Sequence, residues 1–96
     1  MKIWEYELLV TDMQKVAMPE GAQILSVGNQ NNKLCLWALV NPDKSFPDRH
    51  MEVRHIEIIG TGNPIVEPAS MVTRNFIGTV IWDPFVWHVF ERPDKK

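Results

Sequence analysis

The segment IIGTGNPIV, residues 58–66, interrupts an apolar run with two glycines and a proline, which invites comparison with phosphate-binding loops. A dinucleotide-binding loop needs GxGxxG at the start of a helix, but Ile65 stands where the third glycine would be. The Walker sequences GxxxxGKS and GxxxxGKT are absent too. Two interpretations stay open. One is a plain turn at the end of a strand. In the other, the Thr61 hydroxyl and the amides of Gly60 and Gly62 contact a phosphate without a named motif.

Two arginines lie close to this loop in the sequence. Arg54 belongs to the predicted strand that leads into the loop, and Arg74 opens the next predicted strand. If those two strands pair, both guanidinium groups would converge with the loop, which extends to Asn63. A guanidinium together with backbone amides suits a phosphate. The alternative is that each arginine is ordinary surface charge.

The histidines and serines do not form a recognisable catalytic or metal-binding set. No HExxH or CxxC pattern connects His50, His55 and His88, and a zinc site needs three or four ligands. No serine occupies a GxSxG nucleophile elbow. We therefore predict no enzyme activity, no metal and no cofactor. The open alternative is a small nuclease or hydrolase that uses His55 or His88.

Tryptophan is the more suggestive residue type. The chain has four tryptophans in 96 residues, and indole rings fill cores, anchor interfaces and stack on bases. A core of this size does not easily hold four of them, so at least one is expected at a subunit interface or a ligand site. Trp82, beside a predicted turn at Asp83 and Pro84, and Trp4, near the N-terminus, are expected to be the most exposed.

Short apolar segments separated by turn residues indicate the elements that would position these side chains. Seven segments are predicted as strands, at 1–10, 14–18, 22–27, 34–40, 51–59, 76–82 and 85–91. Turns are predicted at PEG, residues 19–21, and at the asparagine-rich GNQNNK, residues 28–33. The segment LCLWALV, residues 34–40, is apolar on both faces and is predicted as a central strand.

This pattern predicts a mostly β protein: a small antiparallel sandwich or barrel of six to seven short strands, with one short helical turn near 68–73. The length of 96 residues predicts a single β-rich domain at 1–92, followed by a frayed tail at 93–96. Because so small a domain buries a limited core, we expect a homo-oligomer.

Charge and composition exclude several classes of function. A net charge of −2 argues against nonspecific DNA binding, which depends on a basic face. The N-terminus lacks the apolar region of a signal peptide, and no segment approaches the ~18 apolar residues of a membrane span. Cys35 is the only cysteine and is expected to be a buried small hydrophobe. These features fit a cytoplasmic protein without a membrane partner.

Several segments together resemble a known family. PEGAQILSV, LCLWALV, GTGNP and WHVFE are similar to segments of a small family of uncharacterised proteins common in phage and prophage genomes, and the similarity covers nearly the whole chain. The resemblance implies a phage origin and a setting in the cytoplasm of an infected host cell. It also implies that histidine often stands at the position of Asn63 in related chains.

These features lead to two functional predictions. The first is a non-enzymatic binder, or sponge, that captures a small phosphorylated nucleotide-type ligand and so counters a host defence. An aromatic ring would stack on the base and arginines would hold phosphates. The predicted ligand-binding residues are Arg54, Gly60, Thr61, Gly62, Asn63, Arg74 and Trp82. The second prediction is a protein–protein adaptor or inhibitor that binds a host or virion protein through exposed tryptophans and strand edges.

Overall fold

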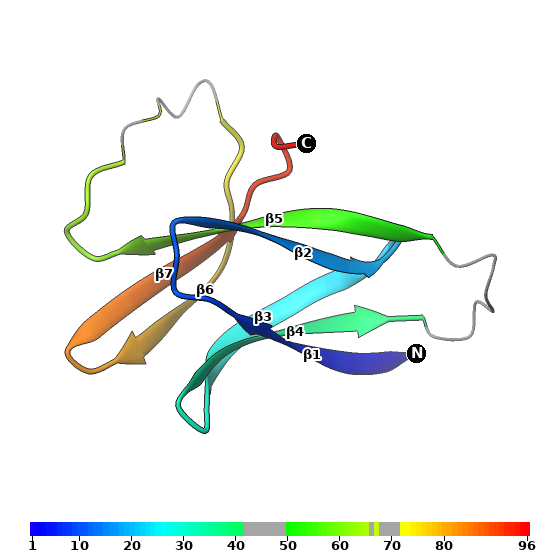
Figure 1. The fold of residues 1–96 in the computed structure, drawn as a ribbon, viewed down its shortest axis with the longest axis horizontal. Helices are drawn as coiled ribbons and strands as arrows, with labels where there is room; N and C mark the ends of the chain where they lie inside the picture. The colour runs from blue at the N-terminus through cyan, green and yellow to red at the C-terminus, as the bar shows by residue number, and fades with distance from the viewer. Residues whose placement is uncertain (42–49, 66, 68–71) are drawn as a thin grey trace.

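A computed structural model describes residues 1–41, 50–65, 67 and 72–96 of the chain. These residues form two antiparallel sheets, with strand orders β1-β4-β3 and β2-β5-β7-β6, and contain no helix (Figure 1). The strands are β1 (Lys2–Leu8), β2 (Met13–Pro19), β3 (Gln23–Gln30), β4 (Lys33–Val40), β5 (Met51–Gly60), β6 (Asn75–Trp82) and β7 (Phe85–Glu91). The prediction of a small antiparallel sandwich is confirmed. Of the predicted helical turn, residues 68–71 lie outside the described residues, and residues 72 and 73 have no regular structure.

Two of the predicted turns are confirmed by backbone geometry. Asn31 and Asn32 have φ values of 53° and 62°, and they form the two-residue connection of the β3–β4 hairpin. Gly21 has a φ of 80° in a turn closed by a 3.0 Å hydrogen bond from the Ala22 amide to the Pro19 carbonyl. Because β2 and β3 belong to different sheets, this second turn carries the chain from one sheet to the other.

The core lies between the sheets, and β4 is the central strand of its sheet, as predicted. Leu34, Leu36, Ala38 and Val40 alternate along β4 and are all buried, where they join buried residues of the other sheet such as Ile56, Ile58, Val80 and Val89. Cys35 is also buried, on the opposite face of β4. Burial and the nearby carboxylates of Glu5 and Glu7 raise the pKa of the Cys35 thiol. The thiol therefore stays protonated, which fits its predicted role as a small hydrophobe.

Successive side chains of β5 lie on opposite faces of its sheet. Ile56 and Ile58 point into the core, whereas Glu57 and Ile59 lie on the opposite face by strict alternation. On one side β5 pairs with β2, and on the other it pairs with β7. Because β7 lies between β5 and β6, the direct pairing considered for the strands of Arg54 and Arg74 does not occur.

No described segment is a helix that is long and apolar enough to cross a membrane.

Candidate functional site

Four apolar side chains form an open cleft at one end of the sandwich, which we call the aromatic cleft. Val10, Trp82, Phe85 and Trp87 line about 270 Å³ of space. Trp82 and Phe85 are cross-strand neighbours next to the turn of the β6–β7 hairpin, and the Phe85 ring stacks on Trp87 at a centroid distance of 5.3 Å and an interplanar angle of 17°. At the left of Figure 1, this turn, the β1–β2 connection and the end of β5 lie at the same end of the molecule.

The cleft forms because the faces of β6 and β7 that pack on the core extend beyond it toward the hairpin turn. Phe85, Trp87 and Val89 share one face of β7 by alternation. Val89 is fully buried and Trp87 is half-buried, whereas Phe85 is 56% exposed. On β6, buried Val80 is followed on the same face by half-buried Trp82. The aromatic rings therefore rest on a packed base while their outer parts stay open to solvent.

A second, polar pocket of about 250 Å³ adjoins the aromatic cleft. It shares Val10 and Trp87 with the cleft, and its polar lining comes from Thr11, Asp12 and Asn63. Gly60, which pairs with Trp87, also lines this pocket.

The missing side chain at Gly60 shapes this pocket. A Cβ at this position would lie 3.2 Å from the Trp87 ring and 2.9 Å from the Asn63 side-chain nitrogen. The glycine therefore allows the indole of Trp87 and the side-chain amide of Asn63 to approach the backbone of Gly60 closely.

The glycine loop itself is a tight turn. The Asn63 amide donates to the Gly60 carbonyl at 3.0 Å, and Gly62 between them has a φ of 88°. The Thr61 amide donates to the Val86 carbonyl at 3.1 Å. The amides of Thr61 and Asn63 are thus used within the protein, in a turn at the end of β5.

His88 connects this loop to the hairpin. Its Nε2 lies 2.7 Å from the Thr61 hydroxyl and its Nδ1 lies 3.0 Å from the Thr79 hydroxyl. Both ring nitrogens are therefore engaged by neutral hydroxyl groups. The arrangement holds the Thr61 side chain against β7 and makes His88 a hydrogen-bonded histidine.

Arg54 lies away from the aromatic cleft and is bound by protein groups. Its guanidinium donates to the Glu91 carboxylate at 2.5 and 2.9 Å, to Glu52 at 2.9 Å and to the Ala22 carbonyl at 2.7 Å. The hydrogen bond to Glu91 is the main cause that raises the pKa of Arg54. A phosphate at this position would have to displace these acceptors.

Arg74 and Arg92 form ion pairs with three acidic residues. We call these five residues the charged cluster: Glu57, Glu67, Arg74, Arg92 and Asp94. Arg74 donates to Glu57 at 2.6 Å and makes an ion pair of 3.9 Å with Glu67. Arg92 has 0% exposure and donates to Glu57 at 2.8 Å, to Glu67 at 3.2 Å and to Asp94 at 2.9 Å. The cluster ties the segment that precedes β6, and the end of the chain, to β5.

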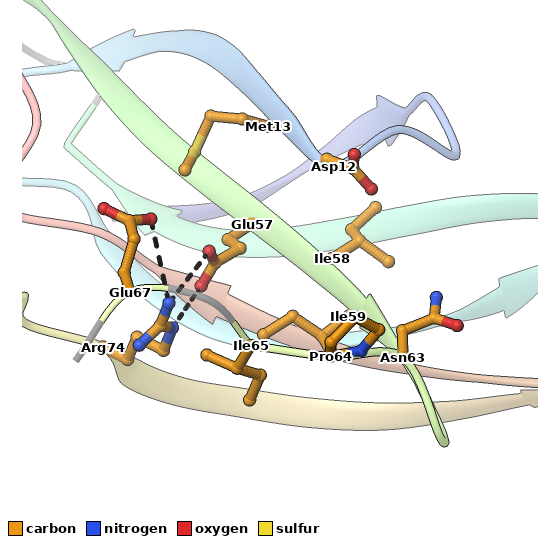
Figure 2. A pocket seen from close by; sticks show the side chains of 10 residues that line it. All are labelled: Asp12, Met13, Glu57, Ile58, Ile59, Asn63, Pro64, Ile65, Glu67 and Arg74. Atoms are coloured by element: carbon orange, nitrogen blue, oxygen red, sulfur yellow. Dashed lines mark hydrogen bonds and ion pairs between the residues drawn. The ribbon is translucent and has the colours of Figure 1, made fainter. Parts of the chain in front are cut away.

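A third pocket, the loop pocket, lies between this cluster and the glycine loop and has a volume of about 300 Å³. Figure 2 shows Glu57, Glu67 and Arg74 at one end of it and the side chains of Asp12 and Asn63 at the other. Apolar side chains such as Ile59, Pro64 and Ile65 lie between these two groups. Asp12 and Asn63 line the polar pocket as well, so the polar pocket shares lining residues with both the loop pocket and the aromatic cleft.

The predicted site residues are therefore divided. Gly60, Asn63 and Trp82 lie around the aromatic cleft and the polar pocket, whereas Thr61 and Gly62 form the adjacent turn. Arg54 and Arg74 sit in separate sets of ion pairs and do not converge. Asp12, Phe85 and Trp87 line these pockets but were not predicted as site residues. The alternation of aromatic residues in FVWHVFE was the signal for the last two.

The described residues contain no group of three or more His, Cys, Asp or Glu side chains placed to hold a metal ion.

The whole chain, residues 1–96, matches the model of one protein family, a domain of unknown function (DUF7352). The chain belongs to this family. Comparison of the DUF7352 chain with the curated proteins and with the solved structures gives no match.

The charged cluster predicts how the stability of the DUF7352 domain depends on pH. The hydrogen bond from Arg92 lowers the pKa of Asp94 from 3.8 to about 2, and Arg92 lowers the pKa of Glu67 as well. A carboxyl group whose pKa is lower in the folded state adds stability above its unfolded pKa, and this contribution disappears as the pH falls through the folded value. We therefore expect the urea midpoint to fall as the pH drops from about 4 to about 2.

The variant Asp94→Asn provides the control for this prediction. It cannot titrate at position 94, so its urea midpoint should change less over the same pH range. Equal pH dependence in the two proteins would contradict the contribution assigned to Asp94.

Proposed function

We propose that this protein is a non-enzymatic binding module that holds a flat ring in the aromatic cleft. The observation that carries the proposal is the cleft itself: about 270 Å³ of open space, which Val10, Trp82, Phe85 and Trp87 line among the described residues. Stacking of a base on an aromatic side chain contributes about 1–3 kcal/mol. Because Trp82 and Trp87 pack against the core, their orientation is largely fixed before a ligand arrives.

A nucleotide-type ligand is one member of this class, since every nucleobase has a flat face that can stack. Capture without turnover would make the protein a sponge, and the resemblance to phage and prophage proteins supports a role against a host defence in the cytoplasm of an infected cell. Homo-oligomerisation belongs to the same proposal. The phosphate part of the ligand has less support, because the guanidinium groups of Arg54 and Arg74 are bound by carboxylates.

A protein–protein adaptor is the second candidate, and a specific observation favours it. Large apolar side chains are exposed outside the aromatic cleft, including Ile3, Phe76 and Ile81. In β1, Ile3 pairs with half-buried Leu39 on the face opposite the core. Apolar side chains grouped on a sheet face suit a protein partner.

Two matched phenylalanine variants test the proposed cleft. Phe85 in the cleft and Phe76 outside it are similarly exposed, at 56% and 62%, and each makes one ring contact, with Trp87 and with Phe90 respectively. We expect Phe85→Ala to weaken the binding of adenosine at least about fivefold, because a stacking face is lost, and Phe76→Ala to leave it unchanged.

The measurement is a titration of intrinsic tryptophan fluorescence with a panel of nucleosides and nucleotides. Equal weakening in both variants would show that the binding site is not the aromatic cleft. If no member of the panel binds the wild-type protein, the adaptor becomes the better candidate, and its partner should be sought by affinity capture from a host lysate.

A further inference from the structure

We propose that the ligand of the aromatic cleft is an organic cation, in which an ammonium group is attached to a flat apolar ring. This inference rests on the proposed function, because it names the chemistry of a ligand for the same cleft. Three observations support it: the aromatic lining, the placement of Asp12, and the ion pairs that hold Arg54 and Arg74 to protein carboxylates.

The aromatic lining attracts positive charge. The faces of Trp82, Phe85 and Trp87 carry the negative part of the ring quadrupole, and an ammonium group within about 6 Å of such a face is stabilised. Tryptophan is the strongest of the aromatic residues in this role. A ring with a short ammonium arm could stack in the cleft and direct the arm toward the polar pocket.

Asp12 is placed to receive that arm. Its carboxylate lines the polar pocket, which shares Val10 and Trp87 with the aromatic cleft. The Asp12 carbonyl accepts a 3.1 Å hydrogen bond from the Ile58 amide, so β5 fixes this part of the β1–β2 connection. Among the described residues, the Asp12 side chain has no hydrogen bond or ion pair to a protein group. It is therefore available to a ligand.

The surroundings disfavour an anion in the same place. In the loop pocket, the carboxylates of Glu57 and Glu67 contact the guanidinium of Arg74, and Asp12 lies at the other end of the pocket (Figure 2). That guanidinium is held by Glu57 at 2.6 Å and pairs with Glu67 at 3.9 Å. Among the described residues, an incoming phosphate would meet carboxylates and an arginine that already pairs with them, whereas an ammonium group would find Asp12 in the lining of the polar pocket.

Three probes with the same ring and different charges test the inference. Phenethylamine is a cation, 2-phenylethanol is neutral and phenylacetate is an anion. Binding to the full chain can be followed by the indole N–H signals in a ¹⁵N–¹H NMR titration at low salt. We expect the signals of Trp82 and Trp87 to shift and that of Trp37 to stay constant, because Trp37 lies on the other sheet. The affinity for phenethylamine should exceed that for phenylacetate at least about tenfold and should fall as salt is added.

Two charge-neutralising variants locate the effect. Asp12→Asn should weaken phenethylamine binding about tenfold and leave 2-phenylethanol binding unchanged, because the shape of the site is kept and only its charge is removed. Glu20→Gln is the control, since Glu20 is exposed and follows β2 at the end opposite Asp12. It should leave the binding of all three probes unchanged.

The outcomes separate this inference from the proposed function. If the three probes bind equally well, or if phenylacetate binds best, the cation inference is overturned while the aromatic cleft remains a binding site. Loss of 2-phenylethanol binding in Asp12→Asn would also overturn it, since that would indicate damage to the site. If none of the probes shifts the signals of Trp82 or Trp87, the proposed function fails and the inference fails with it.

Discussion

Replacing Arg92 with methionine is expected to lower the free energy of unfolding by about 3 kcal/mol. The Arg92 side chain is fully buried and donates hydrogen bonds to Glu57, Glu67 and Asp94. Methionine keeps most of the apolar volume but removes the charge, so Glu57, itself buried, keeps only its contact with Arg74. The cluster is then left with three carboxylates and one guanidinium group, and such an excess of partly buried negative charge is costly, which is the physical reason for the expected loss.

Urea denaturation measures this effect, and two further variants make it specific. Lys33→Met removes a solvent-exposed ion pair, in which Lys33 and Glu7 are 64% and 55% exposed, and should cost less than about 1 kcal/mol. Combining Arg92→Met with Glu57→Gln should recover part of the lost stability, because the excess of carboxylates over guanidinium groups in the cluster is reduced. A cost for Arg92→Met no larger than that for Lys33→Met would refute the view that the cluster stabilises the fold.

Truncating Leu36 to alanine is the second change for which we expect a large effect, a loss of about 3 kcal/mol. Leu36 is fully buried in β4, the central strand of its sheet, with β1 on one side and β3 on the other. The substitution removes apolar contacts and leaves a cavity that the two flanking strands cannot easily close. For a domain of this size, a loss of this magnitude corresponds to a fall of at least about 12 °C in Tm.

Differential scanning calorimetry checks this prediction, with Leu25→Ala as the control. Leu25 lies in β3 of the same sheet but is exposed, so its truncation should change stability by less than about 1 kcal/mol. Similar falls in Tm for the two variants would show that Leu36 is not part of a tightly packed core.

Local sequence signals were sufficient to predict the fold. The alternation of apolar residues and the turn residues located all seven strands to within a few positions. Asn31 and Asn32 tolerate left-handed backbone, which is why the β3–β4 hairpin was recognisable. The continuous apolar run in β4 correctly indicated a central strand, because neighbours on both sides and a core on one face leave little of it exposed.

The candidate site was harder to predict because it depends on strand order. The acceptor that holds Arg54 is Glu91, which comes near only because β7 pairs with β5. The sequence around Arg54 gives no signal for its contact with Glu91, which is 37 residues away. Val10 was assigned to the first strand, which in fact ends at Leu8, so its place in the aromatic cleft was missed. Trp82 was identified as a site residue from its type and its position beside a turn, and these are local features.

β1 and β2 each pair with a strand that comes later in the chain, and this affects how the protein folds during synthesis. β1 and β2 are neighbours in sequence, yet they do not pair with each other. β1 pairs only after β4 is available, and β2 pairs only after β5 is available. Closing such long segments costs chain entropy, so we expect folding on the slow, millisecond-to-second scale of sandwiches rich in non-local pairs. During synthesis the three-stranded sheet can assemble once β4 has left the ribosome. Its apolar face, with Leu34, Leu36 and Val40, then stays uncovered until β5 to β7 emerge. In that interval we expect the nascent chain to aggregate easily and to be bound by a chaperone.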